Sequence, residues 1–147
     1  MLVHQLLSEA RKRLTTIRID ALLIDAARAL SGRPGELVVV CDSDGKVAGV
    51  ITKADVVRQI THCEGAACRM VAASAMTRDV VSCHSDEPLS GVRSRMRQNG
   101  LRHISVVDDR SRPIGVIEAR DALQALLGSA ASEVELLRDY VMSVGYQ

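Results

Sequence analysis

An internal repeat runs through this sequence and restricts the fold to architectures with two similar halves. Placing residues 37–42 (LVVVCD) over residues 103–108 (HISVVD) defines an offset of 66 residues, and the later landmarks then fall into register without a gap. The aligned pairs are Asp20 and Asp86, Asp42 and Asp108, Gly49 and Gly115, and Asp55 and Asp121. A repeat of this length is one supersecondary unit, and so small a unit buries little core alone. We therefore expect the two halves to pack face to face.

Each half passes through the same order of periodicities. An amphipathic helical pattern is followed by a short apolar strand ending in aspartate, a turn, a second strand and another helix. In the first half these segments are 22–30, 37–42, 42–45, 46–51 and 53–60. In the second half they are 88–96, 103–108, 108–113, 113–117 and 119–127. With a strand before its first helix, each half is predicted to be β-α-β-β-α, which places the chain in the α+β class.

Amphipathic helical patterns also flank the two halves, at about 2–13 and 132–144. Terminal helices of this kind cover the edge of a core or contact a partner. The segment between the halves contains Cys, Gly and several Ala, and we interpret it as a connector. The predicted organisation is an N-terminal helix (1–14), a first repeat (15–62), a connector (63–75), a second repeat (76–128) and a C-terminal helix (129–147).

The composition argues against several classes of partner. With no Trp, no Phe and two Tyr among 147 residues, the chain lacks the aromatic platforms on which nucleic-acid bases stack. A net charge of +1 gives no strong field toward nucleic acid or an anionic membrane. The apolar runs, such as 37–41, are too short to span a bilayer, and the N-terminus lacks a secretion signal. We expect a cytoplasmic protein that recognises its ligand at a local site, with neither nucleic acid nor membrane as partner.

Two heptapeptides carry a family resemblance. Residues 49–55 (GVITKAD) resemble the G-h-h-[ST]-x-x-D signature of CBS repeats, and residues 115–121 (GVIEARD) are its second copy. Residues 76–80 (MTRDV) resemble the M-T-x-x-V segment that opens such a repeat, and the likeness covers about 15–127. The resemblance implies a tandem CBS pair, or Bateman module, of pseudo-twofold symmetry that binds AMP, ADP, ATP or another adenosine compound in clefts between its repeats. It also implies a non-catalytic regulatory homodimer acting on a separate, unknown target protein.

Within these motifs, three residues suit the ribose and phosphate of a nucleotide. Asp55 and Asp121 begin helices, and an ionised carboxylate there can accept hydrogen bonds from both ribose hydroxyls. Thr52 precedes a helix N-terminus, where unpaired amides and the helix dipole favour a phosphate. The alternative is that Thr52 and Asp55 are an ordinary helix cap. Gly49 and Gly115 are interpreted as requirements of the backbone rather than as ligand contacts.

The remaining candidates surround the adenine and the phosphates. An adenine ring needs a flat apolar slot, for which the candidates are the strand residues Ile17, Val38, Val81 and Ile104. Arg102 and His103 occupy positions where CBS proteins often place basic residues near the phosphates.

The two predicted clefts differ at one position. Where the first repeat has Thr52, the second has Glu118, whose carboxylate repels a phosphate. We therefore expect the cleft with Thr52 and Asp55 to be the occupied one. The cleft beside Glu118 would be empty, or would take a ligand with little negative charge.

Cysteine and histidine residues around the connector provide the main rival to a nucleotide site. The possible zinc ligands are His62, Cys63, Cys68, Cys83 and His84, although their spacing is irregular. A Cys63–Cys68 thiol switch and a ligand-free dimerisation or protein-interaction module remain as alternatives, and free thiols are the default expectation. The sequence has no G-x-S-x-G, P-loop or HExxH motif, so we expect no catalytic residue, no metal site and no required cofactor.

Overall fold

The structure, a computed structural model, describes residues 1–32, 37–62 and 69–145, without the side chains of 131–136, 139–140 and 142–145 in the last helix. The predicted α+β class and the β-α-β-β-α order of each half are confirmed. The first half comprises β1 (Thr16–Arg18), α2 (Leu23–Ser31), β2 (Leu37–Cys41), β3 (Val47–Thr52) and α3 (Lys53–His62). The second comprises β4 (Ser82–His84), α4 (Leu89–Gln98), β5 (His103–Val107), β6 (Pro113–Glu118) and α5 (Ala119–Gly145).

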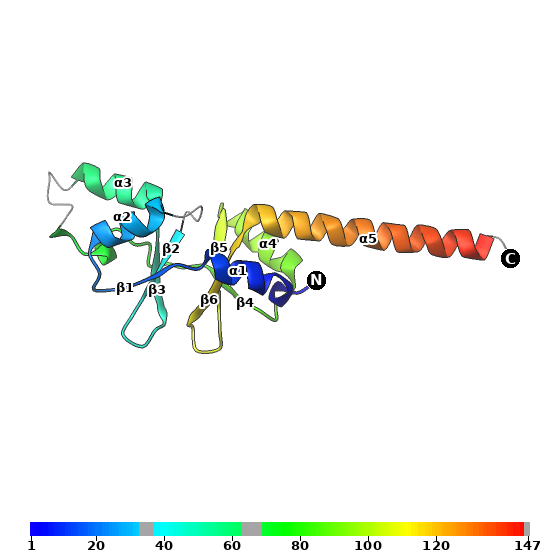
Figure 1. Cartoon of the computed structure of the whole chain (residues 1–147), viewed down its shortest axis with the longest axis horizontal. Helices are drawn as coiled ribbons and strands as arrows, with labels where there is room; N and C mark the ends of the chain where they lie inside the picture. Colours follow the sequence, from blue (N-terminus) through cyan, green and yellow to red (C-terminus); the bar gives the residue numbers. More distant parts are fainter. Residues whose placement is uncertain (33–36, 63–68, 146–147) are drawn as a thin grey trace.

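Each half contains one three-stranded sheet, and the two sheets have the same topology. Their strand orders are β1-β2-β3 and β4-β5-β6, in which the first pair is parallel and the second antiparallel. The hairpins that follow the central strands project from the molecule side by side (Figure 1). Gly45 and Ser111, which are 66 residues apart, have positive φ angles of 79° and 62° in these two turns. The repeat therefore extends to the conformation of single turn residues.

The two halves exchange their flanking segments. The 3₁₀ turn η1 (Val3–Leu6) and helix α1 (Leu7–Arg13) precede the first half, but Val3 and Ala10 are buried in the core of the second half. Conversely, the 3₁₀ turn η3 (Ala72–Ser74) leads toward the second half, but Ala72 and Met76 are buried in the core of the first. The core of each half therefore includes residues from a segment that adjoins the other half in the sequence.

At Gly49 and Gly115 these exchanged segments lie directly against the sheets. A Cβ added at Gly49 would lie 2.7 Å from Met76 Sδ, and one added at Gly115 would lie 2.8 Å from Ala10 Cβ. Side chains at these positions would overlap with the segments packed against them. The role predicted for both glycines, a requirement of the backbone, agrees with this packing.

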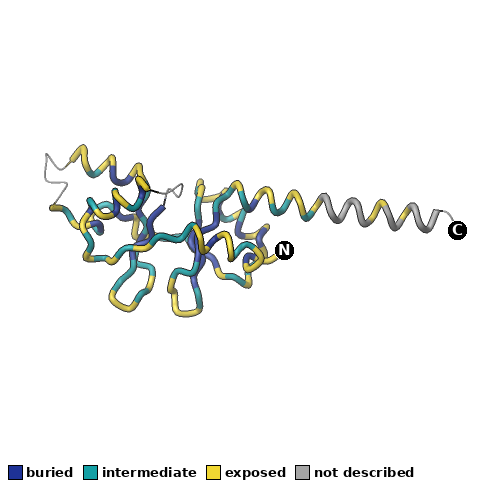
Figure 2. Tube along the Cα trace, viewed as in Figure 1, coloured by how far each residue is buried: buried dark blue, intermediate teal, exposed yellow. Residues whose placement is uncertain are grey.

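The sheets face each other across a third apolar cluster formed by Leu37, Val39 and Val116. Alternate residues of β2, such as Val38, point away from this cluster into the core of their own half. The hairpins also touch, because the Val47 amide donates a hydrogen bond to the Ser111 carbonyl oxygen at 2.9 Å. Figure 2 shows buried stretches in the strands and also in the helices that pack against the sheets. The expected face-to-face packing of the halves is present.

Helix α5 differs from the prediction. The sequence pattern predicts two helices, at 119–127 and 132–144, but α5 is a single helix of 27 residues. Gly128 costs a helix only about 1 kcal/mol relative to alanine, and the neighbouring Ala130 is a strong helix former, so the helix continues. Among the described residues, no helix is long and apolar enough to cross a membrane.

Candidate functional site

A cleft of about 420 Å³ lies between the two halves, and both line it. The first half contributes the start of β2, the end of β3 and the first turn of α3. The second half contributes the segment before β4 and the start of β5. Five of the predicted site residues are brought together here: Thr52, Asp55, Val81, Arg102 and His103.

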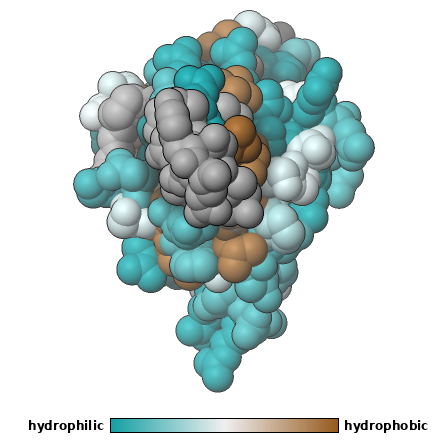
Figure 3. Space-filling view, turned by 90° about the vertical axis from the view of Figure 1, so that its right-hand side faces the viewer, coloured by the Kyte–Doolittle hydropathy of each residue, from teal (hydrophilic) through white to brown (hydrophobic). Residues whose placement is uncertain are grey.

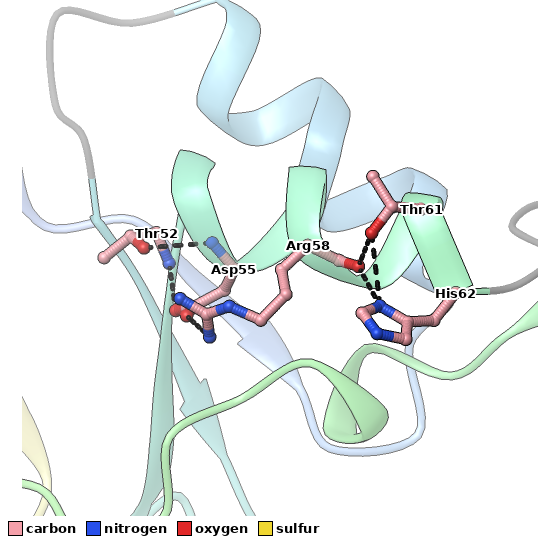
Figure 4. Close-up of polar contacts among 5 residues, drawn as sticks. All are labelled: Thr52, Asp55, Arg58, Thr61 and His62. Carbon is pink, nitrogen blue, oxygen red and sulfur yellow. Dashed lines mark hydrogen bonds and ion pairs between the residues drawn. The ribbon is translucent and has the colours of Figure 1, made fainter.

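The N-terminus of α3 points its first turn at this cleft. The Thr52 amide donates to Asp55 Oδ2 at 2.9 Å, and the Asp55 amide donates to Thr52 Oγ1 at 3.3 Å (Figure 4). This reciprocal pair is a capping box, so the two residues do cap the helix. Lys53 and Ala54, the first two residues of the helix, also line the cleft. Amides in the first turn of a helix have no partner within the helix and favour an anion.

Asp55 is the one charged residue buried among the described residues, at 8% exposure. Arg58 reaches back along α3 toward it, with Nη1 3.4 Å from Asp55 Oδ1 (Figure 4). A carboxylate has about four acceptor sites, so these contacts leave capacity for a ligand hydroxyl. Because the Arg58 side chain is 68% exposed, its contact with Asp55 is weak and exchangeable.

Three basic side chains lie on the rim or wall of the cleft. Lys53 comes from α3, Arg102 directly precedes β5, and His103 is the first residue of β5. Two carboxylates, Asp55 and Asp79, line the same cleft. The side chains therefore roughly balance in charge, and the α3 N-terminus adds a positive dipole end.

The apolar part of the cleft differs in detail from the predicted adenine slot. Val81 lines it, but Ile17 and Val38 pack with the core of the first half and Ile104 with that of the second. The physical reason is the two-residue period of a strand, which sends neighbouring side chains to opposite faces. The cleft is lined instead by the residues beside the predicted ones, Leu37 on β2 and Ser105 on β5.

Ser105 is a polar residue that the sequence reasoning missed. It is 1% exposed and lines the cleft, and its Oγ has no hydrogen-bond partner among the residues that the structure describes. Its repeat counterpart is Val39, which lies in the apolar cluster between the sheets. That substitution of Ser for Val within an aligned strand is the signal that could have identified it. A buried hydroxyl usually finds a partner, and a ligand in the cleft can provide one.

A second cleft of about 410 Å³ contains Glu118 and Asp121, the repeat counterparts of Thr52 and Asp55. Arg13, at the end of α1, binds both: Nη1 lies 2.8 Å from Glu118 Oε2, and Nη2 lies 2.6 Å from Asp121 Oδ2. Three carboxylates, counting Glu9, face this single guanidinium in the lining. The second cleft is therefore acidic, and the predicted ribose ligand Asp121 is already engaged by the protein.

The possible zinc ligands, the alternative to a nucleotide site, form no group of three or more among the described residues. Cys63 and Cys68 lie outside the described residues. His62 Nδ1 is 2.8 Å from the Arg58 carbonyl oxygen at the end of α3 (Figure 4). Within 1–32, 37–62 and 69–145, no three Cys, His, Asp or Glu residues are grouped as metal ligands. Burial raises the pKa of the Cys83 thiol to about 12 and also raises that of Cys41, so both are neutral and poorly nucleophilic.

Comparison with known proteins identifies both halves. A sequence profile of the CBS domain matches residues 5–62 and again 71–128. The CBS-domain containing protein ATU1752 of Agrobacterium tumefaciens has 28% identity and a TM-score of 0.72, over 85% of this chain and 98% of that one. The CBS domain pair of protein MJ0100, solved in complex with 5′-methylthioadenosine and S-adenosyl-L-methionine, has 25% identity and a TM-score of 0.73, over 88% and 98%.

Some curated relatives are much longer than this chain. The L-aspartate semialdehyde sulfurtransferase of Methanocaldococcus jannaschii is 28% identical over 106 residues, which are 72% of this chain and 20% of that protein. An uncharacterized 17.7 kDa protein of Acidianus ambivalens is 25% identical and matches over 86% of this chain and 79% of its own length. The chain thus spans a fifth of the enzyme, and the likeness is confined to the CBS pair.

Proposed function

This chain belongs to the CBS-domain family, and we propose that it binds an adenine nucleotide of the AMP, ADP or ATP class in the first cleft and signals the binding to a partner protein. CBS pairs are regulatory modules. We further propose that the module acts as a cytoplasmic homodimer and performs no catalysis itself.

The single observation that carries the proposal is the convergence at one cleft of the α3 N-terminus, a buried carboxylate and basic side chains from the opposite half. The Asp55 carboxylate accepts from the ribose hydroxyls, displacing the exposed Arg58. The first-turn amides of α3, with Lys53 and Arg102, bind the phosphates. These groups come from both halves, so a bound nucleotide bridges them.

The adenine ring is assigned to the apolar part of the cleft. Leu37, Val50 and Val81 supply its walls. The buried Ser105 hydroxyl can hydrogen-bond a ring nitrogen or the exocyclic amine, which would give it the partner that the described residues do not provide. Ser105 thereby adds a specificity-determining contact to the residues predicted from the sequence.

The complex of MJ0100 with 5′-methylthioadenosine and S-adenosyl-L-methionine supports an adenosine ligand for this chain. Neither of those ligands carries a phosphate, so that complex does not itself favour AMP, ADP or ATP. In this chain the first cleft adds Lys53 and Arg102 to the α3 dipole. Because Asp55 and Asp79 offset these two charges, the preference for a phosphate over a cationic sulfonium rests on the positive end of the α3 dipole and on Lys53 and Arg102 acting where the phosphates bind. We therefore rank the nucleotides above S-adenosyl-L-methionine.

The test is isothermal titration of the protein with AMP, ADP, ATP, S-adenosyl-L-methionine and 5′-methylthioadenosine, using Asp55→Asn and the matched control Asp121→Asn. We expect one nucleotide to bind saturably, Asp55→Asn to weaken it at least about tenfold, and Asp121→Asn to leave it unchanged. Equal weakening by both variants would contradict the assignment to the first cleft. Absence of binding by the folded protein would contradict the nucleotide function and favour a pure interaction module.

A further inference from the structure

Helix α5 extends well beyond the two halves that it follows. Its first turns pack inward, since Ala122 is buried and Ala125 and Leu126 join the core of the second half. The rest of the helix projects away from the body of the protein (Figure 1). Most of its described residues there are exposed (Figure 2), and apolar surface lies next to the end of the helix in the end-on view (Figure 3).

The exposed apolar residues of α5 follow a heptad spacing. Leu123, Leu127, Leu137 and Val141 are 44%, 61%, 65% and 65% exposed. Leu123 and Leu137 are two heptads apart, as are Leu127 and Val141, and Ala130 falls on the same stripe. In sequence, Val134 and Val144 continue the alternation of four- and three-residue steps. A strict 3.5-residue period is the pattern of a coiled-coil seam rather than of a helix covering a globular core.

We propose that α5 pairs with α5 of a second copy of this chain in a parallel, two-stranded coiled coil. The seam, called here the α5 seam, consists of the heptad positions Leu123, Leu127, Ala130, Val134, Leu137, Val141 and Val144. One set of seam positions (127, 134, 141) has valine at two of three places, and the other set (123, 130, 137, 144) has leucine at two of four, which approaches the combination of a β-branched residue with leucine that favours two strands. The same stripe on each copy is self-complementary, as a twofold interface requires.

Charge complementarity selects the parallel orientation. In the heptad, position 133 flanks the seam on one side and position 138 on the other, and these positions hold Glu and Arg. In a parallel pair, residue 133 of one helix lies opposite residue 138 of the other, which is five places later in the sequence. Each copy would therefore pair its Glu133 with Arg138 of the other, twice by symmetry.

The seam spans residues 123–144, or about 33 Å of helix at 1.5 Å per residue. In proteins most of the stability of a helix comes from packing of its apolar face, and burying the apolar stripe of α5 on a second helix would supply that packing. The inference deepens the homodimer proposed above but does not depend on ligand binding, because Thr52, Asp55 and Ser105 lie on other elements.

The first test measures mass by light scattering and sedimentation for the full chain. We expect wild type at twice 15.9 kDa. The double variant Leu137→Glu, Val141→Glu should be monomeric, with unchanged nucleotide titration and an unchanged melting transition of the body, because both side chains are exposed in the single chain. Ser132→Glu, off the seam, is the matched control and should stay dimeric. A monomeric or trimeric wild type, or a double variant that stays dimeric, would overturn the proposal.

The second test is a charge swap that reports orientation. Glu133→Lys and Arg138→Glu should each raise the dimer dissociation constant about fivefold or more, and the combined variant should restore it. Failure of the combined variant to recover would overturn the parallel pairing. Because these variants leave the first cleft intact, their nucleotide affinity separates failure of this inference from failure of the proposed function.

Discussion

Removing the Arg13 guanidinium should destabilise the protein by about 1–2 kcal/mol. The side chain makes two ion pairs, at 2.8 Å to Glu118 and 2.6 Å to Asp121, and all three side chains are between 25% and 33% exposed. Partly exposed pairs of good geometry contribute about 0.5–1 kcal/mol each. Arg13→Ala also leaves the Glu118 and Asp121 carboxylates near each other without a cation. The dipole at the N-terminus of α5 stabilises both carboxylates, so the loss of folding free energy stays within this range.

Urea unfolding followed by circular dichroism measures this loss, with Lys12→Ala as the matched control. Lys12 is the neighbouring residue, and its pair with Glu9 is longer, at 3.2 Å, and 73% and 64% exposed. We expect the control to cost at most about 0.5 kcal/mol. In 1 M NaCl the free energies of unfolding of Arg13→Ala and Lys12→Ala should approach each other, because salt screens the ion pairs that the two variants lose. An Arg13→Ala variant that is no less stable than the control at low salt would refute the role assigned to Arg13 in the second cleft.

Three further outcomes are expected. Calorimetry should give one nucleotide per chain, because the second cleft is acidic and its Asp121 is paired; two equal sites would contradict this. Gly115→Ala should lower the free energy of unfolding by about 1–3 kcal/mol through overlap with α1, whereas Gly91→Ala, which has open space in α4, should be neutral or stabilising in the same urea assay. The Arg95 hydrogen bond lowers the pKa of Glu87. The ionised Glu87–Arg95 pair therefore stabilises the fold fully above the ordinary glutamate pKa, and this stabilisation is lost as pH falls through the lowered pKa of Glu87. Glu87→Gln removes the titrating group, so the free energy of unfolding of this variant should fall less steeply at acid pH than that of wild type.

The fold was predictable because the repeat is visible in the sequence. Aligning Asp42 with Asp108 fixed the order of elements in both halves, and the same offset relates Gly45 to Ser111 in the turns. The length of α5 was not predictable from local pattern. Gly128 indicates a break by its propensity, but the surrounding alanines outweigh it.

Site residues were predictable where they belong to a motif that is contiguous in the sequence. The prediction failed where the direction of a side chain on a strand determines which residue lines the cleft. Thr52 and Asp55 belong to a contiguous motif, so their placement at the α3 N-terminus followed from it. Val38 and Ile104 lie on the apolar strands that border the cleft, but a shift of one residue along a strand moves a side chain to the opposite face. Arg13 could not be inferred at all, because it is 108 residues from Asp121 and reaches it only through the exchange of α1.

Arg102 connects the first cleft to the root of α5. Its side chain lines the cleft, and its carbonyl oxygen accepts the hydrogen bond of the Ala119 amide, the first residue of α5, at 2.8 Å. A phosphate that attracts the Arg102 side chain therefore acts on a residue whose backbone holds the start of the projecting helix. Nucleotide binding can change the pairing of α5 with a second copy only if the nucleotide favours one orientation of α5 over another. By thermodynamic linkage, pairing would then change nucleotide affinity by the same factor. Equal nucleotide affinity in wild type and in the monomeric Leu137→Glu, Val141→Glu variant, as expected above, would show that this contact does not favour one orientation of α5 over another.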